Sequence, residues 1–261
     1  MKNEKPVLRI IKIGGNIIDH PHQLAEFLTD FAKLEGNTIL IHGGGKIATE
    51  MAKEMGIQTQ MIEGRRVTDE ASLRIVSMVY AGWINKSIVA KLQGLGLNAL
   101  GLSGPDGRLI ISKKRNATPI DYGFVGDIEK VDGAAIKQFL SMGYHPIFAP
   151  ITADLSGQLL NTNADTMAQA LAIALSEYYQ VHLIYCFEKQ GVLLDPENET
   201  SVITNIDQRS FEELKTKGII SAGMIPKLEN ALKAISQGVH EVQITHAKNL
   251  TSPSKGTSIK A

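Results

Sequence analysis

The sequence is poor in cysteine and contains no long hydrophobic run. Its one cysteine, Cys186, excludes an internal disulfide and a multi-cysteine metal site, and the surrounding residues VHLIYCF indicate a buried, unreactive thiol. No run reaches the roughly 18 apolar residues that span a bilayer, and the N-terminus lacks the apolar segment of a signal peptide. We therefore expect a cytoplasmic protein without a membrane partner.

The sequence also lacks net charge, because 27 lysines and arginines balance 27 aspartates and glutamates. No overall field draws such a protein to nucleic acid or to an anionic membrane, so any anionic ligand needs a local site. With 261 residues, of which 43% are hydrophobic, the chain is long enough for a substantial core.

Apolar, β-branched segments alternate with amphipathic ones along the chain. This alternation predicts an α/β fold, a three-layer αβα sandwich around a central, mainly parallel sheet. A further segment, 112–132, interrupts the pattern and is predicted to form a β-hairpin or flap. The expected strands span 7–13, 37–43, 97–102, 145–151, 181–187 and 239–245, and the expected helices span 22–35, 47–56, 70–96, 134–143, 165–176 and 224–238.

The stretch ILIHGGGK, residues 39–46, places three glycines after a predicted strand. It lacks the spacing and the hydroxyl residue of a Walker loop, so a P-loop enzyme is excluded. GGGKIA matches a relaxed dinucleotide-binding pattern at Gly43, Gly45 and Ala48, with Glu63 about twenty residues on for a ribose. This match is weak, and a tight strand-to-helix turn explains the glycines equally well.

A second glycine turn, IIKIGGN, strengthens the case for an anion site. It places Lys12, Gly14 and Gly15 at the carboxyl end of another strand, where parallel sheets bind ligands. Glycine turns let backbone N–H groups approach phosphate oxygens closely. Lys12 lies in a strand that is otherwise apolar, and burying its ammonium group is costly unless an anion pairs with it.

Further polar clusters occur near predicted helix starts. In EGRRVTDE, Arg66 is a candidate for binding a carboxylate, whereas Arg65 is expected in solvent. In LLNTNAD, capping accounts for one of Asn161, Asn163 and Asp165 but not readily for all three. Lys227 follows in the first turns of another helix.

Together these residues suit phosphoryl transfer, which needs backbone donors, two lysines, an organising carboxylate and room for Mg²⁺. The absence of a nucleophilic triad points to a carboxylate as the acceptor, because that group is already ionised at neutral pH. The predicted product is an acyl phosphate.

Seven motifs, in this order and spacing, resemble those of the amino acid kinase family over nearly the whole chain: IIKIGGN, ILIHGGGK, EGRRVTDE, DYGFVGDI, LLNTNAD, GMIPKLENA and KGTSI. HGGG, RVT and GFVG most resemble the branch that phosphorylates N-acetyl-L-glutamate in the second step of arginine biosynthesis. The resemblance implies that ATP, carrying Mg²⁺, phosphorylates the side-chain carboxylate and yields N-acetyl-L-glutamyl 5-phosphate.

The resemblance also implies residue roles. Lys12 and Lys227 would stabilise the transition state, and Asp165 would hold both lysines, with Mg²⁺ nearby but no direct protein ligand. The other implied contacts are those with the amino acid, from Gly44, Gly45, Arg66 and Asn161, and those with phosphates or nucleotide, from Gly14, Gly15, Gly43, Glu188, Gly191, Val192, Ser221, Gly223 and Met224.

The sequence departs from the family pattern on the nucleotide side. Relatives usually carry TDVxGV there, whereas this chain has CFEKQGV, with Glu188 in place of the aspartate and Gly191 and Val192 retained. An altered nucleotide pocket is expected rather than a lost one, because both lysines and Asp165 remain.

The resemblance also implies an organisation into two lobes that share one sheet: residues 1–160 for the amino acid and dimerisation, and 161–261 for ATP. Arginine-inhibited relatives carry an extra N-terminal helix that links dimers into hexamers. Only eleven residues precede Lys12, so we expect a homodimer that arginine does not inhibit.

Three alternatives stay open. The acyl group could be succinyl rather than acetyl; Lys113, Lys114 and Arg115 could receive the extra carboxylate, although a solvated charge run is the expected interpretation. A catalytically silent sensor of amino acid or nucleotide would keep the same pockets. A dinucleotide-binding oxidoreductase would explain GGGKIA but would leave IIKIGG, NTNAD and Lys227 without a role.

Overall fold

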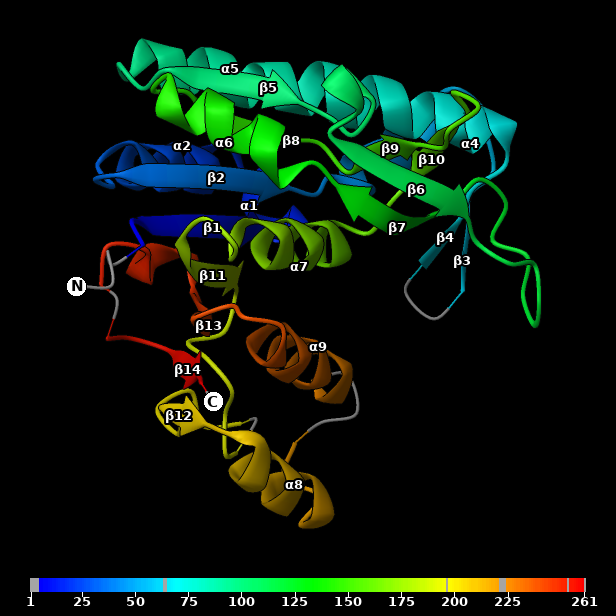
Figure 1. The fold of residues 1–261 in the computed structure, drawn as a ribbon. Coiled ribbons are helices and arrows are strands. Elements are labelled where there is room, and N and C mark those ends of the chain that lie inside the picture. The colour runs from blue at the N-terminus through cyan, green and yellow to red at the C-terminus, as the bar shows by residue number, and fades with distance from the viewer. Residues whose placement is uncertain (1–4, 63–64, 196, 221–223, 253, 261) are drawn as a thin grey trace.

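A computed structural model describes residues 5–62, 65–195, 197–220, 224–252 and 254–260 (Figure 1). Its strands are β1 (Val7–Ile13), β2 (Asn37–His42), β3 (Gln60–Ile62), β4 (Arg65–Val67), β5 (Ala99–Leu102), β6 (Ile110–Lys114), β7 (Gly126–Val131), β8 (His145–Phe148), β9 (Ile151–Ala153), β10 (Leu159–Asn161), β11 (Gln180–Phe187), β12 (Asn205–Ile206), β13 (Glu241–His246) and β14 (Thr257–Ile259).

Its helices are α1 (Gly15–Ile18), α2 (Pro21–Ala32), α3 (Gly45–Glu54), α4 (Glu70–Val76), the π-helix η1 (Ser77–Ile84), α5 (Asn85–Gly94), the 3₁₀-helix η2 (Asp106–Arg108), α6 (Gly133–Ser141), α7 (Ala164–Leu175), α8 (Gln208–Thr216), α9 (Ile225–Ser236) and the 3₁₀-helix η3 (Ala247–Asn249). None of the helices in the described part of the chain is long and apolar enough to cross a membrane.

The main sheet has eight strands in the order β12-β14-β13-β11-β1-β2-β8-β5. All neighbouring strands in it are parallel except β13 and β14, which are antiparallel. Helices α6, α7 and α9 cover one face, as Figure 1 shows, and α2, α3 and α5 pack against the other. The predicted αβα sandwich with a mainly parallel sheet is therefore confirmed.

Alternation along β1 divides the core between these two faces. Leu8 and Ile10 pack in the cluster beneath α7 and α9, whereas Ile11 and Ile13 pack in the cluster beneath α2. All four side chains are fully buried, as expected for a strand covered on both sides. Since side chains alternate between faces, Lys12 lies on the side of α7 and α9.

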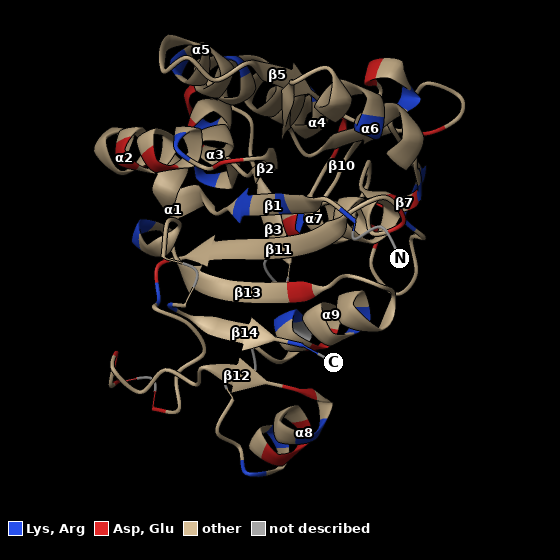
Figure 2. Cartoon of the chain, turned by 60° about the vertical axis from the view of Figure 1, so that its left-hand side comes forward, with Lys and Arg blue, Asp and Glu red and all other residues tan. Residues whose placement is uncertain are grey.

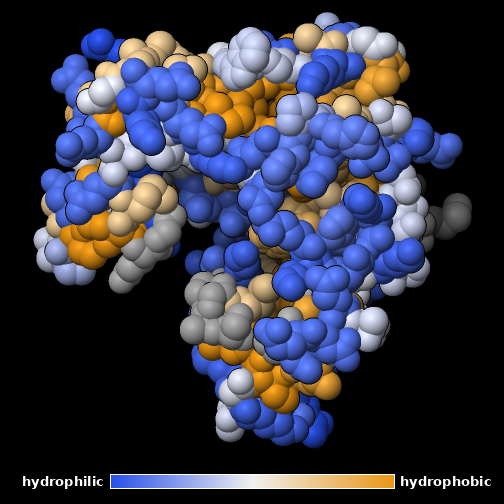
Figure 3. All heavy atoms as spheres, turned by 180° about the vertical axis from the view of Figure 1, so that it is seen from behind, coloured by the Kyte–Doolittle hydropathy of each residue, from blue (hydrophilic) through white to orange (hydrophobic). Residues whose placement is uncertain are grey.

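A second, four-stranded sheet in the order β10-β9-β6-β7 stands at the carboxyl edge of the main sheet. The flap predicted over 112–132 is confirmed as the antiparallel hairpin β6–β7, and β3 pairs with β4 as a separate hairpin. Figure 3 shows a recess, lined mostly by hydrophilic residues, between the part of the chain with β3 and β4 and the C-terminal part.

Acidic and basic residues are interspersed along the helices in Figure 2, in keeping with the zero net charge. Helix α8, whose N-cap Asp207 forms a capping box with Ser210, was not predicted from the sequence. The helix expected over 70–96 is not regular, because the π-helix η1 lies between α4 and α5.

Candidate active site

Two glycine turns lie side by side at the carboxyl edge of the main sheet. Strands β1 and β2 are parallel neighbours with Ile13 opposite His42, so the turns that follow them meet. A Cβ atom added at Gly43 would lie 3.9 Å from the backbone nitrogen of Gly15. The N–H groups of both turns are therefore available at one place for a phosphate.

Gly44 is the N-cap of α3 and has a φ of 149°, a conformation essentially confined to glycine. A Cβ atom there would collide with Cδ1 of Ile84 and lie 3.1 Å from a ring carbon of Tyr80. Both contacts come from the π-helix η1, so the helix packs directly against the turn. Close approach of backbone to side chains, and not only turn geometry, requires glycine at this position.

Three charged side chains converge beside these turns from three elements. Lys12 of β1 forms an ion pair with Asp165 in the first turn of α7, with 2.7 Å between Nζ and Oδ1. The Lys12 side chain is 9% exposed and that of Asp165 is 33% exposed. The ring of Phe187 lies 5.4 Å from Nζ of Lys12 and 4.0 Å from Nζ of Lys227, so both ammonium groups share one aromatic neighbour.

Electrostatics within this cluster favour an added anion. Burial lowers the pKa of Lys227 below its usual range, the charge of Asp165 opposes that shift, and the charge of Lys12 adds to it. Burial together with the charge of Asp165 also raises the pKa of Tyr185, whose hydroxyl donates a hydrogen bond to the backbone oxygen of Asp165. One carboxylate thus faces two poorly solvated ammonium groups, a set that a phosphoryl group would complete.

A separate cavity of about 200 Å³ opens on the other side of the glycine turns. Gly44, Gly45, Arg66 and Asn161 line it, so the structure brings together the four residues expected at the amino acid. Arg66, which is 7% exposed, donates hydrogen bonds to the Gly45 carbonyl at 2.8 Å and to the Thr49 hydroxyl at 2.7 Å. These bonds fix its guanidinium group against the start of α3.

The flap is held over this cavity by Thr68. The N–H of Thr68 donates to the Tyr122 carbonyl, and the Thr68 carbonyl accepts from the N–H of Phe124. The amide of Asn161 donates to the Thr68 hydroxyl at 3.0 Å, and the N–H of Asn161 donates to the Phe124 carbonyl. A Cβ atom on Gly123 would collide with the Thr68 carbonyl, so the GFVG glycine permits this contact.

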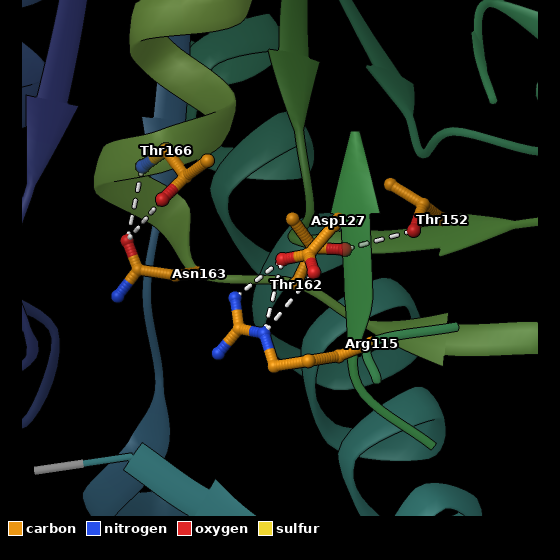
Figure 4. Close-up of polar contacts among 6 residues, drawn as sticks. All are labelled: Arg115, Asp127, Thr152, Thr162, Asn163 and Thr166. Atoms are coloured by element: carbon orange, nitrogen blue, oxygen red, sulfur yellow. Dashed lines mark hydrogen bonds and ion pairs between the residues drawn. The ribbon is translucent and has the colours of Figure 1, made fainter. Parts of the chain in front are cut away.

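Arg115, in the flap, is a cavity residue that the sequence analysis assigned to solvent. Figure 4 shows its guanidinium group paired with Asp127; the closest approach is 2.5 Å, from Nη2 to Oδ1. Its side chain is 22% exposed. Lys113 does lie in solvent, paired with Glu129 at 3.2 Å. The interpretation as a solvated charge run is therefore wrong for Arg115.

Helix α7 explains the remaining polar residues of NTNAD. Asn163 caps the helix by accepting from the N–H of Thr166 at 3.0 Å, as Figure 4 also shows. Asp165 does not cap the helix and pairs with Lys12, whereas Asn161, bonded to Thr68, lines the cavity. Thr162 hydrogen-bonds Thr152 at 2.8 Å beneath the flap.

A smaller cavity of about 150 Å³ lies in the C-terminal part of the chain. It is lined mainly by apolar residues and contains Gly191, Val192 and Met224, three of the residues expected at the nucleotide. Lys189 and Ile220 also line it and were not predicted. Ser221 and Gly223 lie outside the described residues.

The structure does not bring Glu188 to this cavity. Glu188 follows Phe187, the last residue of β11, and lies outside the strand. There it borders a cavity of about 590 Å³ formed by α2, β11 and η3. Its charge nevertheless raises the pKa of Lys227, so it contributes to the lysine cluster through the electrostatic field.

The structure therefore places two glycine turns and the charged cluster of Lys12, Asp165 and Lys227 near a cavity that three arginines line, with a mainly apolar cavity in the C-terminal part of the chain. The sequence profile of the amino acid kinase family matches residues 8–246. The chain belongs to the amino acid kinase family. This assignment replaces the dinucleotide-binding interpretation of GGGKIA.

Relatives within the amino acid kinase family match over nearly their full length. The chain is 54% identical to a protein named acetylglutamate kinase from Cytophaga hutchinsonii, over 93% of this chain and 92% of that one. It is 49% identical to an acetylglutamate kinase from Bacteroides thetaiotaomicron, over 97% of this chain and 98% of that one.

Among solved structures, the chain is similar to the N-acetylglutamate synthase of Neisseria gonorrhoeae in complex with coenzyme A and N-acetyl-glutamate. The TM-score is 0.82 at 22% identity, with 97% of this chain and 59% of that chain covered. At this identity the likeness supports the fold alone.

Proposed function

We propose that the protein is an acetylglutamate kinase, which transfers the γ-phosphoryl group of ATP to the side-chain carboxylate of N-acetyl-L-glutamate in arginine biosynthesis. The observation that carries the proposal is the convergence of Lys12 and Lys227 on Asp165 beside two glycine turns. The names of relatives at 54% and 49% identity support the choice of substrate.

In this proposal the amino acid occupies the cavity under the flap. Arg66, whose Nη2 is engaged by Gly45 and Thr49, binds its α-carboxylate through a charge-assisted hydrogen bond from the rest of the guanidinium group, and Asn161 hydrogen-bonds the acylated amide. The side-chain carboxylate then points past Gly44 and Gly45 toward the lysines. ATP extends from the apolar cavity at Gly191 to the glycine turns, so the two substrates meet at the edge of the sheet.

In the transfer step, an oxygen of the side-chain carboxylate forms a bond to the γ-phosphorus. The bond from that phosphorus to the bridging oxygen breaks, and its electron pair leaves with ADP. No proton moves, because a carboxylate of pKa about 4 is ionised at neutral pH. Lys12 and Lys227 stabilise the charge on the equatorial and bridging oxygens, and Asp165 orients both lysines.

We further propose that Mg²⁺ enters with the nucleotide. In the described residues no group of three or more His, Cys, Asp or Glu side chains is placed to hold a metal ion. Mg²⁺ is commonly held by substrate phosphates and water with few protein ligands. Asp165, which is paired with Lys12, would lie near the ion without ligating it, and bound Mg²⁺ would neutralise charge on the phosphates.

N-succinyl-L-glutamate is a second candidate acceptor, because three arginines line the cavity. The charge of Arg115 is already paired with Asp127, and Arg66 is assigned to the α-carboxylate. Arg65 makes no side-chain hydrogen bond or ion pair with the residues that the structure describes, so it is the group available to a succinyl carboxylate. We favour the acetyl group on the names of the relatives.

The proposal is tested by ADP release from Mg-ATP with N-acetyl-L-glutamate, N-succinyl-L-glutamate or L-glutamate as acceptor. Hydroxylamine converts an acyl phosphate into a hydroxamate, which distinguishes carboxylate transfer from ATP hydrolysis. The proposal predicts turnover with the acetyl compound and little with glutamate. Faster turnover with the succinyl compound would replace the acceptor, and binding without turnover would favour a sensor.

We also propose which part of the chain binds each substrate and how the protein assembles. Residues 1–160 bind the amino acid, residues 161–261 bind ATP, and the protein forms a homodimer in the cytoplasm through the first of these lobes. Trp83 and Met78 of η1 support the dimer, because they are 69% and 47% exposed. Figure 3 shows hydrophobic side chains in the upper part of the face it views. Sedimentation velocity would contradict the dimer if it gave a monomer or a hexamer.

A further inference from the structure

The histidine that precedes the three glycines has no role in the mechanism above. His42 is the last residue of β2 and is fully buried. Ile39 and Ile41 face α7, so His42 faces the opposite side of the sheet, away from the lysines. It therefore does not touch the reacting atoms, and its burial has a cost that needs a reason.

Hydrogen bonds define the state of this histidine. Nδ1 lies 2.8 Å from the carbonyl oxygen of Gly43, which can only accept, so Nδ1 carries the proton. Nε2 lies 3.2 Å from the amide nitrogen of Asn85, which can only donate, so Nε2 is unprotonated. The imidazole is therefore neutral and fixed in one tautomer.

The orientation of Asn85 is itself fixed. Its amide nitrogen also donates to the Ile147 carbonyl at 2.8 Å, and its oxygen accepts from Nζ of Lys86 at 3.2 Å. Lys86 in turn donates to the Gly101 carbonyl. Asn85 is 1% exposed and uses both amide hydrogens, so exchanging the positions of its amide nitrogen and oxygen would lose hydrogen bonds.

The π-helix η1, which directly precedes Asn85, places two further side chains on the glycine turn. Asn85 follows directly after the π-helix η1, whose Ile84 and Tyr80 press against Gly44. π-helical segments are rare and frequently occur at functional sites. Here the segment brings Tyr80 and Ile84 onto Gly44 and, at the same time, Asn85 onto His42.

We infer that His42 and Asn85 are positioning residues for the phosphate-binding turn. Neutral His42 holds the Gly43 carbonyl toward the protein interior, and Asn85 holds His42 in the tautomer that can do so. A carbonyl that rotated into the cleft would set its negative end against the phosphates and turn the N–H groups of the glycines away. The inference deepens the proposed kinase function and depends on it for the identity of the anion.

Two substitutions each retain one of the two hydrogen bonds of His42 and remove the other. The amide of His42→Asn reaches about as far as Nδ1 and retains a donor for the Gly43 carbonyl. The amide of His42→Gln reaches about as far as Nε2, so it keeps a contact with Asn85 and loses the carbonyl. His145→Gln is the matched control, because His145 is a partly buried histidine that bonds Thr38, away from the turn.

Calorimetric titration with ADP and with adenosine gives a readout that a general structural role would not produce. We expect His42→Gln to weaken ADP binding about tenfold, the effect of one lost hydrogen bond, while adenosine binding stays within about twofold. His42→Asn and His145→Gln should bind ADP like the wild type. Equal ADP affinity for all variants, or equal losses for ADP and adenosine, would overturn the inference.

The tautomer of His42 can be measured in the wild type, so this test does not depend on the folding of a variant. Nitrogen-15 NMR of labelled histidine at neutral pH should show His42 with a protonated Nδ1 and an unprotonated Nε2. A protonated Nε2 would overturn the inference. If the wild type showed no kinase turnover but His42→Gln still weakened ADP binding, the proposed function would be contradicted. The positioning role of His42 would stand.

Discussion

Replacement of Lys12 by methionine tests the catalytic cluster most informatively, because methionine keeps the length of the side chain and removes its charge. Two unit charges 2.7 Å apart attract each other by roughly 6 kcal/mol at an effective dielectric constant of about 20, and the cost of burying the Lys12 ammonium offsets much of that. Lys12 therefore contributes little net stability from its pair with Asp165, and its charge is available to the transferring group.

The expected kinetic effect follows from that charge. Removing one preorganised donor from a transition state typically lowers kcat by about 10²–10³-fold, or about 3 to 4 kcal/mol. We expect Lys12→Met to fall in this range. The KM for the amino acid should change by less than about threefold, since Arg66 and Asn161 line a cavity that Lys12 does not.

Steady-state kinetics of ADP release, with each substrate varied in turn, measure both quantities. Lys53→Met is the control, because Lys53 is exposed at the far end of α3. A kcat for Lys12→Met within tenfold of the wild type would refute the assignment of Lys12 as a transition-state stabiliser. A large rise in KM with unchanged kcat would instead make it a ground-state binding residue.

Three further predictions follow from the same contacts. Arg66→Lys should raise the KM for the amino acid about tenfold and leave that for ATP unchanged, because lysine lacks the planar fork; a rise confined to ATP would contradict the carboxylate assignment. Burial lowers the pKa of His42 from 6.5 to about 4, so between these pH values the unfolded chain binds a proton that the folded protein does not. The free energy of unfolding should therefore fall by about 3 kcal/mol as the pH drops from 6.5 to about 4. Urea titrations should show a loss that is larger by about this amount for the wild type than for His42→Asn, because His145, His182 and His246, whose pKa values are also lowered, titrate in both proteins; parallel curves would disprove it. Gly44→Ala should destabilise the fold by more than about 2 kcal/mol, because the added Cβ meets Ile84 and the ring of Tyr80 at a φ of 149°, whereas Gly56→Ala, at a φ of 72° with open space around it, should cost about 1 kcal/mol. Equal shifts in Tm for the two variants would refute the packing argument.

Strong periodicity made most of the main sheet predictable. The strand expected over 7–13 coincides with β1, and the other five expected strands overlap β2, β5, β8, β11 and β13. Strands β12 and β14 were missed because they contain two and three residues, too few to show a pattern. Helix α8 was missed because its sequence is mostly polar and Phe211 is its one buried residue.

Residues at strand ends were the most predictable part of the site. Lys12 stood out as a charge in an apolar strand, and the structure pairs it with Asp165 as the family resemblance implied. Arg115 was misjudged because the β6–β7 hairpin places Asp127 opposite Lys113, where the side chain of Arg115, two residues further on, reaches it. Such pairings depend on tertiary register and leave no signal in local sequence.

Positions beyond the ends of regular elements were harder to predict. Glu188, expected at the nucleotide, lies one residue past the end of β11, where strand alternation no longer fixes the direction of a side chain, and it borders the cavity beside α2. The role of Asn85 could not be foreseen, since a regular helix over 70–96 would place its side chain differently from the helix with the π segment.

The most direct test of the central claim is phosphorus-31 NMR of the protein with Mg-ATP and N-acetyl-L-glutamate. The account predicts that the γ-phosphate signal of ATP declines while signals of ADP and of an acyl phosphate grow together, and that hydroxylamine abolishes the acyl phosphate signal. ADP and inorganic phosphate without an acyl phosphate intermediate, or an unchanged ATP spectrum, would contradict it.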